Sequence, residues 1–502
     1  MASSKTVSKK RSKIAGCAAF CAAALFTAFF IFWRLDADTI LGFDEGRHAV
    51  NALEMYQSKD LIVTTYNGEI DYFNLKPPLS VYMIAVQYAI FGVNLFAIRF
   101  GAACCYFLTA LLSALYVAHK RSFWAGSLTL LLFGCSKHLL LDSMARKGDA
   151  NALYNLFFTG AMLLLLILCE RKREAQKREL LLYTGIGLLC AAAFLTKSFH
   201  AGVPLLIVLI VFFALGKKRT ALAEWGAFAG SCALPVLVWA LLRYTRDGFT
   251  FLKGMLFEDV LHRSAEVIAG TEGGFFYYFR SMFQENSTLV VVFFLGIGAA
   301  LLFYEGGLVL PRMKNGREWL VPALWVVLPC LIFAIPKTKL ITYVYPSYIG
   351  LYVCGGLVLP GIVKQAKSVL AKVVLAVACC FGVLLLSFNV KADYKRIAGE
   401  TTDSFEELLL EHAELFSGEG NIYTNHVNEK MDGVWMQDEL LAIDLYTSLH
   451  CVDGSIEGYR NDEGECYLIL NYIWTSPEDN DVAEGRDGSI IYQDADFVVL
   501  KK

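Results

Sequence analysis

Charged residues are scarce in this 502-residue chain, in which Asp, Glu, Lys and Arg fill 18% of the positions. A soluble domain usually has about 25% charged residues. Hydrophobic residues make up 56% of the chain and occur in long uninterrupted blocks. This balance excludes an ordinary soluble enzyme, and the blocks exclude a disordered chain, a disulfide scaffold and a collagen-like repeat. The sequence therefore predicts a polytopic α-helical membrane protein.

Several familiar motifs are also missing. The sequence has no Gly-rich phosphate loop, and no cluster of His, Cys and Asp has the spacing of a zinc site. Its basic residues fall in short loops between apolar segments, so no block is typical of a nucleic-acid patch. We therefore expect no nucleic-acid partner and assign no cofactor, although a divalent metal stays possible.

The net charge of −2 combines two very different parts of the chain. Residues 391–502 hold 25 acidic and 8 basic residues, a net charge of −17, whereas residues 1–390 hold 22 acidic and 37 basic residues, a net charge of +15. This contrast predicts a basic N-terminus at 1–13, a transmembrane domain at 14–390 and an acidic C-terminal domain at 391–502.

The acidic domain is expected to have a small α/β fold. Alternating polar and apolar residues predict strands at 421–424, 466–472 and 497–500, and residues 404–416 are typical of a helix. Cys451 and Cys466 are the two cysteines in this polar region, and they could form a disulfide if it faces an oxidising compartment. The other cysteines lie mostly inside apolar segments, where small core residues are expected.

About eleven apolar segments are long enough to cross a bilayer. They are residues 14–33, 97–118, 123–141, 150–169, 180–196, 200–215, 221–242, 287–304, 319–335, 340–360 and 370–390. Segment 79–93 is shorter, and if it lies in the membrane interface the Lys- and Arg-rich loops all fall on the cytoplasmic side. We therefore expect a cytoplasmic N-terminus, an uncleaved first span and an extracytoplasmic C-terminal domain.

The first outer loop, residues 34–96, carries the acid pair Asp44–Glu45 directly after a span. Two interpretations stay open for this pair. Asp44 could cap a solvated helix at 45–58. Alternatively, it could be a general base at the rim of a membrane cavity, with its pKa adjusted by burial and nearby cations.

Basic residues recur on the predicted outer face, against the positive-inside tendency. A single one is explained by a side chain snorkelling from the end of a span. Several separate outer loops that each offer cations indicate an anionic lipid phosphate, which Arg and Lys bind through charge-assisted hydrogen bonds. The candidate phosphate ligands are Lys76, Arg146, Lys197, Arg263, Lys337 and Lys339.

An ordered set of motifs resembles the GT-C polyprenyl-phosphate-sugar glycosyltransferases, namely the protein O-mannosyltransferase family and its bacterial relatives similar to lipid A aminoarabinose transferase. The resemblance covers residues 14–390. Its motifs are Asp44-Glu45, Ala52, Glu54-Met55, Asn67-Gly68, Lys76-Pro77-Pro78-Leu79, Ala145 to Asp149, Leu195-Thr196-Lys197 and Lys339 to Pro346. Each motif alone is weak, but together they fall in order on the expected side of the membrane.

This resemblance implies transfer of a sugar from a polyprenyl-phosphate carrier to an acceptor hydroxyl of a lipid, protein or wall glycan. Transfer would occur at the extracytoplasmic face of a bacterial plasma membrane, with inversion. Asp44 would take the acceptor proton with Glu45 nearby, and the six cations would face the leaving phosphate. Asp149, His262, Tyr343 and Tyr345 would line the sugar or acceptor pocket.

The chain departs from the family pattern at two positions. Relatives often have a second Asp where this chain has Asn151, and His48 replaces a frequent Tyr. Two other classes of function therefore stay open. A transporter or flippase of lipid-linked sugars would place ionisable residues in mid-span and build broken helices, and this sequence shows few mid-span charges and no internal repeat. A non-catalytic membrane scaffold is the third possibility.

Overall fold

The structure is a computed structural model that describes residues 2–40, 44–170, 176–216, 221–258, 273–285, 319–365, 369–399, 403–425, 427–428, 434–435, 437–452, 455–475 and 480–502. Within these residues, six segments are long and apolar enough to cross a membrane, judged by length and composition. They are Ser12–Phe32, Leu95–Lys120, Ala150–Glu170, Gln176–Leu215, Leu222–Asp247 and Ile341–Val358. The predicted polytopic helical architecture is confirmed, and eleven spans stay a prediction. The predicted span 287–304 lies outside the described residues.

The chain forms two compact units. The first consists of Met1–Arg34, Leu75–Ser80 and Phe100–Ile397, and the second of Leu35–Asn74, Val81–Arg99 and Ala398–Lys502. Residues 34–96, which the sequence predicts to be part of the transmembrane domain, are divided between the units, and most of them group with the C-terminal residues. Each unit is described by itself.

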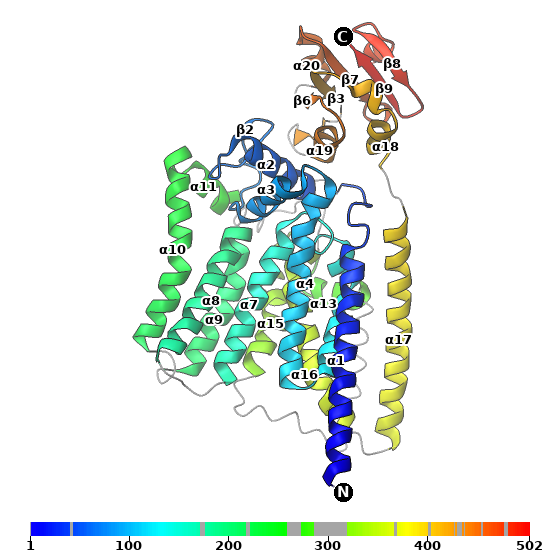
Figure 1. Ribbon diagram of the computed structural model, residues 1–502. Coiled ribbons are helices and arrows are strands. Elements are labelled where there is room, and N and C mark those ends of the chain that lie inside the picture. The colour runs from blue at the N-terminus through cyan, green and yellow to red at the C-terminus, as the bar shows by residue number, and fades with distance from the viewer. Residues whose placement is uncertain are drawn as a thin grey trace. The chain divides into compact units, whose positions relative to one another are not determined.

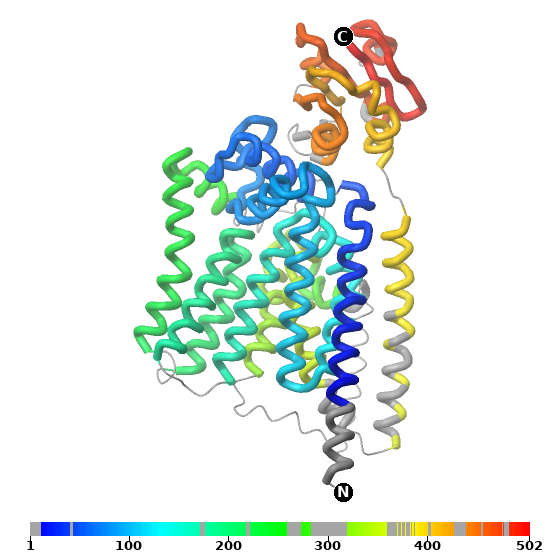
Figure 2. Tube along the Cα trace, viewed as in Figure 1, coloured from blue at the N-terminus to red at the C-terminus, as the bar shows by residue number. Residues whose placement is uncertain are grey.

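The first unit is helical (Figures 1 and 2). Its elements are α1 (Ala2–Phe32), most of α4 (Leu95–Lys120), α5 (Phe123–Gly134), α6 (Lys137–Leu141), α7 (Ala150–Glu170), α8 (Gln176–Lys197), η1 (Ser198–Ala201), α9 (Gly202–Leu215), α10 (Leu222–Asp247), α11 (Thr250–Leu256), α13 (Tyr277–Glu285), α15 (Leu320–Phe333), η4 (Ile341–Val344), α16 (Tyr345–Gln365) and α17 (Val369–Ala398). Helix α8 packs between α7 and α10, α1 packs on α5, and α15 packs on α16.

Small residues set the closest helix contacts in this unit. A Cβ atom on Gly187 of α8 would lie 2.5 Å from the carbonyl oxygen of Phe228 in α10. Only glycine therefore fits at this crossing. Lipid tails are as apolar as leucine, so close packing of this kind, rather than hydrophobic exclusion from water, holds membrane helices together.

The second unit combines Leu35–Asn74 and Val81–Arg99 with the α/β domain. Its loop elements are α2 (Asp44–Ser58), the hairpin strands β1 (Thr65–Tyr66) and β2 (Glu69–Ile70), most of α3 (Leu79–Phe91), and the start of α4. Its C-terminal elements are α18 (Ser404–Glu411), η5 (Ala413–Phe416), β3 (Asn421–Thr424), β4 (Val427–Asn428), β5 (Val434–Trp435), α19 (Gln437–Tyr446), β6 (His450–Cys451), α20 (Ser455–Asn461), β7 (Cys466–Asn471), η7 (Tyr472–Trp474), α21 (Asn480–Ala483), β8 (Ser489–Gln493) and β9 (Phe497–Lys501). The predicted small α/β fold is confirmed.

The main sheet has the strand order β6-β3-β7-β9-β8. Strand β3 runs parallel to β6 and β7, and β9 runs antiparallel to β7 and β8. Successive strand residues face opposite sides. Ile469 accordingly packs with Leu441 of α19, whereas Leu470 packs with Tyr459 of α20. Both faces of the sheet are therefore covered by helices.

Cys451 and Cys466 do not form the disulfide that their position allowed. Both are free and buried. Cys451 lies opposite Ile422 on one side of β3, and Cys466 lies opposite Asn421 on the other side. Two strand spacings of about 4.8 Å separate them, whereas the Cα atoms of a disulfide lie within about 7 Å. The intervening strand makes the bond impossible in this fold.

One hydrophobic core joins the outer loop to the C-terminal residues within the second unit. Helix α2 packs on α19, and their buried residues belong to a single cluster that includes Ala49, Leu53 and Leu441. The main-chain N–H of Ile40 donates to Glu406 Oε1 at 2.9 Å. The C-terminal domain is therefore part of the structure that holds α2.

A carboxyl group at this α2–α19 contact makes the second unit sensitive to pH. Burial and the nearby charge of Glu54 raise the pKa of Asp444 to about 7. The folded state therefore holds a proton on Asp444 more tightly than the unfolded state, whose pKa is near 3.8. Protonated Asp444 therefore stabilises the folded state at acid pH. This contribution to the free energy of unfolding, at most about 4 kcal/mol, is lost as the pH rises from about 4 through about 7.

We expect Asp444→Asn to raise the unfolding temperature above pH 7 and to have little effect near pH 4, because it removes this buried charge. Thermal unfolding of the full-length protein between pH 4 and 8 measures the difference. The exposed Asp496→Asn is the matched control. An equal shift for both variants at pH 8 would contradict the assignment.

Candidate active site

The candidate base Asp44 is the first residue of α2, and its side chain is exposed. The ring Nδ1 of His48 hydrogen-bonds to the main-chain oxygen of Asp44 at 2.7 Å, which fixes the first turn of the helix. A carboxylate at this position is favoured by the positive end of the helix dipole. Asp44 is therefore the first residue of the helix rather than a cap that precedes it, and the helix is largely buried rather than solvated, while the Asp44 side chain is exposed.

Glu45 has a different environment from its neighbour. Its side chain is fully buried and forms a bidentate ion pair with Arg99, at 2.8 Å to Nε and 3.0 Å to Nη2. The Arg99 guanidinium also donates to the carbonyl oxygens of Leu35, Asp38 and Thr39. Arg99 thus ties the start of α2 to the segment before it, and we assign Glu45 to positioning Asp44.

Sequence reasoning missed Arg99. The sequence did hold one signal for this residue. Arg99 is the third residue of the predicted span 97–118, and a charged residue within a span requires a buried partner.

We expect Arg99→Met to destabilise the second unit by about 3–5 kcal/mol, because it leaves the Glu45 charge buried and unpaired. Thermal unfolding of the purified protein measures this loss. The double variant Glu45→Gln/Arg99→Met is expected to recover much of it, because neither charge remains. If the double variant is less stable than Arg99→Met, the ion pair is not the cause.

Other residues of the first loop build the scaffold around α2. Asp71 accepts hydrogen bonds from Arg47 at 2.8 and 2.9 Å and from Asn51 at 3.0 Å. Burial alone would raise the pKa of Asp71, but its hydrogen bonds and the charge of Arg47 outweigh burial and lower the pKa. Asn51 also accepts from the Asn74 side chain at 2.9 Å. These contacts hold the end of the loop against α2.

The Asn67-Gly68 motif is a two-residue hairpin turn. Both residues have positive φ, 55° and 77°, which is the backbone required between antiparallel strands in a turn of this length. Glu54 accepts a hydrogen bond from the Gly68 N–H at 3.2 Å. The resemblance motifs at 54–55 and 67–68 therefore have a structural role.

In the first unit, Asp149, Asn151 and Lys197 form a buried polar chain. They are 2%, 1% and 6% exposed. The amide nitrogen of Asn151 donates to Asp149 and to the carbonyl oxygen of Ser143, and Lys197 Nζ donates to the amide oxygen of Asn151. Asn151, where relatives often have an Asp, thus links an acid and a cation without adding a charge. This arrangement places one cation from α8 beside the start of α7.

Aromatic rings surround Lys197. Its Nζ lies 5.8 Å from the ring centre of Tyr343 and 6.0 Å from that of Tyr154. His200 packs against Tyr343 at 4.8 Å, and its carbonyl oxygen accepts from the Tyr154 hydroxyl at 2.9 Å. The predicted pocket residue Tyr343 is therefore next to a candidate phosphate ligand. Tyr154 and His200 were not predicted, and only their place near Lys197 in the folded chain identifies them.

Arg146 and Lys339 contact the ends of helices. The Arg146 guanidinium donates to the carbonyl oxygens of Phe30, Ile31 and Trp33 at the end of α1. Lys339 Nζ donates to the carbonyl oxygens of Phe333, Ala334 and Pro336 at the end of α15. Cations neutralise the negative end of a helix dipole and its unpaired carbonyl groups. Both cations therefore contact main-chain oxygens at helix ends in this structure, and their role as phosphate ligands stays a prediction.

The other predicted site residues have different surroundings from one another. Lys76 is partly buried and follows Leu75, which packs on Trp239 and Phe251. Lys337 is exposed, and Tyr345 is buried with its hydroxyl 3.5 Å from the carbonyl oxygen of His138. Arg263 and His262 lie outside the described residues.

Known proteins match large parts of this chain. The Dolichyl-phosphate-mannose-protein mannosyltransferase family matches residues 75–239, a range that includes Lys76, Asp149 and Lys197. One relative is the undecaprenyl phosphate-alpha-4-amino-4-deoxy-L-arabinose arabinosyl transferase of Aeromonas hydrophila. It is 26% identical to this chain over 373 residues, which are 72% of this chain and 64% of that protein. The same enzyme of Yersinia pestis (strain Pestoides F) is 30% identical over 346 residues, 64% of this chain and 56% of that protein. The chain thus spans between half and two thirds of the length of these relatives.

Comparison with solved structures identifies the fold of this chain. ArnT from Cupriavidus metallidurans bound to undecaprenyl phosphate matches with a TM-score of 0.69 and 16% identity, over 96% of this chain and 97% of that chain. The chain has the GT-C fold. The oligosaccharyltransferase AglB from Archaeoglobus fulgidus, in complex with an inhibitory peptide and a dolichol-phosphate, also matches, with a TM-score of 0.53 and 12% identity over 92% and 70% of the two chains. The resemblance to GT-C proteins of the aminoarabinose-transferase type is confirmed.

Proposed function

We propose that this GT-C protein is an integral membrane glycosyltransferase that moves a sugar from a polyprenyl-phosphate carrier to an acceptor hydroxyl. The acceptor oxygen forms a bond to the anomeric carbon as the bond from that carbon to the phosphate oxygen breaks. Asp44 takes the acceptor proton, and the polyprenyl phosphate leaves with the electron pair. Attack opposite the leaving group inverts the anomeric configuration.

The observation that carries this proposal is the match to ArnT over nearly the whole of both chains. Two features of the chain support it. Asp44 offers an exposed carboxylate at the start of a helix that a buried ion pair holds in place. Lys197 supplies a buried cation that lies close to aromatic rings. A positioned base contributes about 10²–10⁴-fold, and a preorganised donor facing developing charge contributes about 10²–10³-fold.

The reaction needs a donor phosphate site built from cations. We propose Lys197 and Lys76 as its first ligands, with Lys337 and Arg263 as further candidates, and Tyr343 in the wall of the sugar pocket. We also propose the orientation expected from the distribution of basic loops, with the N-terminus in the cytoplasm and the C-terminal domain outside a bacterial plasma membrane.

A turnover assay tests the proposal. Purified full-length protein in lipid is offered a panel of undecaprenyl-phosphate sugars together with an extract of candidate lipid, protein and glycan acceptors. Sugar-dependent release of undecaprenyl phosphate is expected with at least one donor. If no donor is consumed but labelled donor crosses the bilayer of sealed vesicles, the protein is a transporter. If neither occurs, the scaffold interpretation replaces the enzyme.

A further inference from the structure

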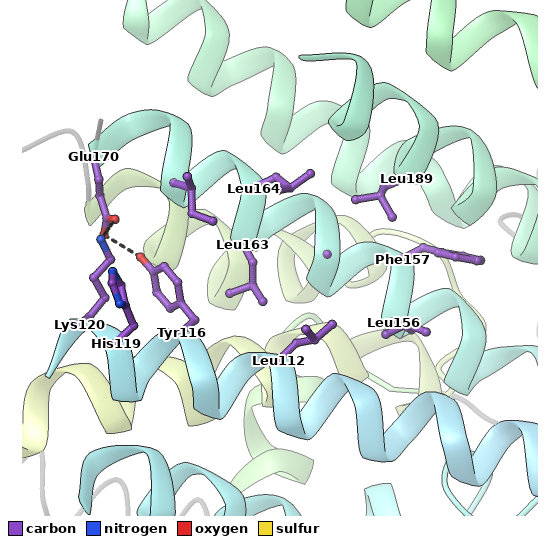
Figure 3. Close-up of a pocket in the computed structure, with 12 residues that line it drawn as sticks. Leu112, Tyr116, His119, Lys120, Leu156, Phe157, Leu163, Leu164, Glu170 and Leu189 are labelled. Carbon is purple, nitrogen blue, oxygen red and sulfur yellow. Dashed lines mark hydrogen bonds and ion pairs between the residues drawn. The ribbon is translucent and has the colours of Figure 1, made fainter. Parts of the chain in front are cut away.

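A groove runs along the first unit at the junction of α4, α7 and α8 (Figure 3). Its volume is about 840 Å³. Apolar side chains of the three helices point into it, including Leu112 of α4, Leu163 of α7 and Leu189 of α8. All three helices belong to segments that are long and apolar enough to cross a membrane, and a groove between such spans would face hydrocarbon. Leu112 is 42% exposed, which shows that the groove is open at its side.

The length of the groove fits one lipid chain. Its lining on α7 extends from Leu156 to Glu170, which at 1.5 Å per residue is about 21 Å. One leaflet of a bilayer has a hydrocarbon thickness of about 15 Å. The groove can therefore hold an acyl chain over the depth of a leaflet and still reach its head group.

The polar groups of the groove are gathered at one end (Figure 3). Lys120 forms an ion pair with Glu170, and Glu170 also accepts a hydrogen bond from the Tyr116 hydroxyl at 2.7 Å. The Lys120 side chain is 30% exposed and that of Glu170 is 10% exposed. His119 lines the same end. This end therefore offers one cation and one anion side by side.

We propose that this groove binds one phospholipid whose zwitterionic head group carries a primary amine, as in phosphatidylethanolamine. One acyl chain fills the apolar part. The lipid phosphate accepts hydrogen bonds from Lys120, whose ammonium group has three donors, and the lipid ammonium donates to Glu170. Because Lys120 and Glu170 cancel each other's charge, the site matches a zwitterion better than an anionic head group. This site is separate from the residues proposed for sugar transfer.

Lipid retention tests the proposal. The full-length protein is reconstituted with equal parts of phosphatidylethanolamine, phosphatidylglycerol and phosphatidylcholine, then solubilised and washed, and the lipid retained per chain is measured by mass spectrometry. About one phosphatidylethanolamine per wild-type chain is expected. Leu112→Trp fills the groove and Lys120→Met removes the phosphate ligand, so each should lower retention at least about tenfold.

A matched control lies on the same helix. Leu115 is 44% exposed and does not line the groove, so Leu115→Trp should retain lipid as the wild type does. Glu170→Gln should remove the preference for phosphatidylethanolamine over phosphatidylglycerol, which also tests the site if Leu112→Trp does not fold. Equal retention by Leu112→Trp and Leu115→Trp, equal retention of the three lipids by the wild type, or displacement by undecaprenyl phosphate would each overturn the proposal.

Discussion

Replacing Asp44 by Asn is expected to lower sugar transfer by about 10²–10⁴-fold, the contribution of a positioned general base. Asparagine has nearly the same shape and can still stand at the start of α2, but it cannot take a proton from the acceptor hydroxyl. The rate constant of the chemical step should therefore fall while donor binding stays within a few-fold. Single-turnover release of undecaprenyl phosphate and binding of the labelled donor measure the two quantities separately.

A matched control for this experiment is Asp36→Asn, since Asp36 is an exposed acid of the same outer loop that precedes α2. It should leave turnover unchanged. If Asp44→Asn is as active as Asp36→Asn, Asp44 is not the base, and the buried Asp149 becomes the next residue to replace. If Asp44→Asn binds no donor, its effect is on the site rather than on proton transfer.

Replacing Lys197 by Met is expected to lower transfer by about 10²–10³-fold, because the leaving phosphate gains negative charge that this buried cation would stabilise. The loss should be larger in the chemical step than in donor affinity, since the charge on the phosphate increases as the glycosidic bond breaks. Rate constants and donor affinity of the purified variant separate these two contributions.

Lys395→Met is the control for Lys197→Met, because Lys395 is an exposed cation of the first unit that is not among the proposed phosphate ligands. Lys197→Arg should retain part of the activity, since the charge is kept while its geometry changes. Equal losses for the 197 and 395 variants would show a general effect of removing a positive charge. An unchanged chemical step in Lys197→Met would remove Lys197 from the proposed phosphate site.

Local patterns in the sequence were sufficient for much of the fold. The hydrophobic runs predicted helices, and the alternation at 421–424, 466–472 and 497–500 predicted strands that the structure has at β3, β7 and β9. The predicted helix at 404–416 is divided into α18 and η5. Hydropathy could not show that α2 shares a core with α19, because this contact joins residues hundreds of positions apart.

The site was harder to predict because residue type alone does not show what a cation contacts. By residue type, Arg146, Lys197 and Lys339 are equal candidates for phosphate. Arg146 and Lys339 donate to main-chain carbonyl groups at helix ends, whereas Lys197 joins Asn151 among aromatic rings. Likewise, Glu45 beside Asp44 is neutralised by Arg99. These differences depend on tertiary contacts that no spacing in the sequence encodes.

The shared core of the second unit also determines when its parts can assemble during protein synthesis. Buried residues of the cluster come from 40–98 and again from 405–499, so the helix that carries Asp44 completes its core only after the C-terminal residues exist. At about 5–20 residues per second, a ribosome needs about 15–60 s to synthesise the intervening chain. During that interval Ala49, Leu53 and Met55 lack the C-terminal residues that share their core in the finished protein. Release of the finished chain is therefore the step that assembles this loop, and a prematurely terminated product would leave its apolar face open to chaperones and proteases.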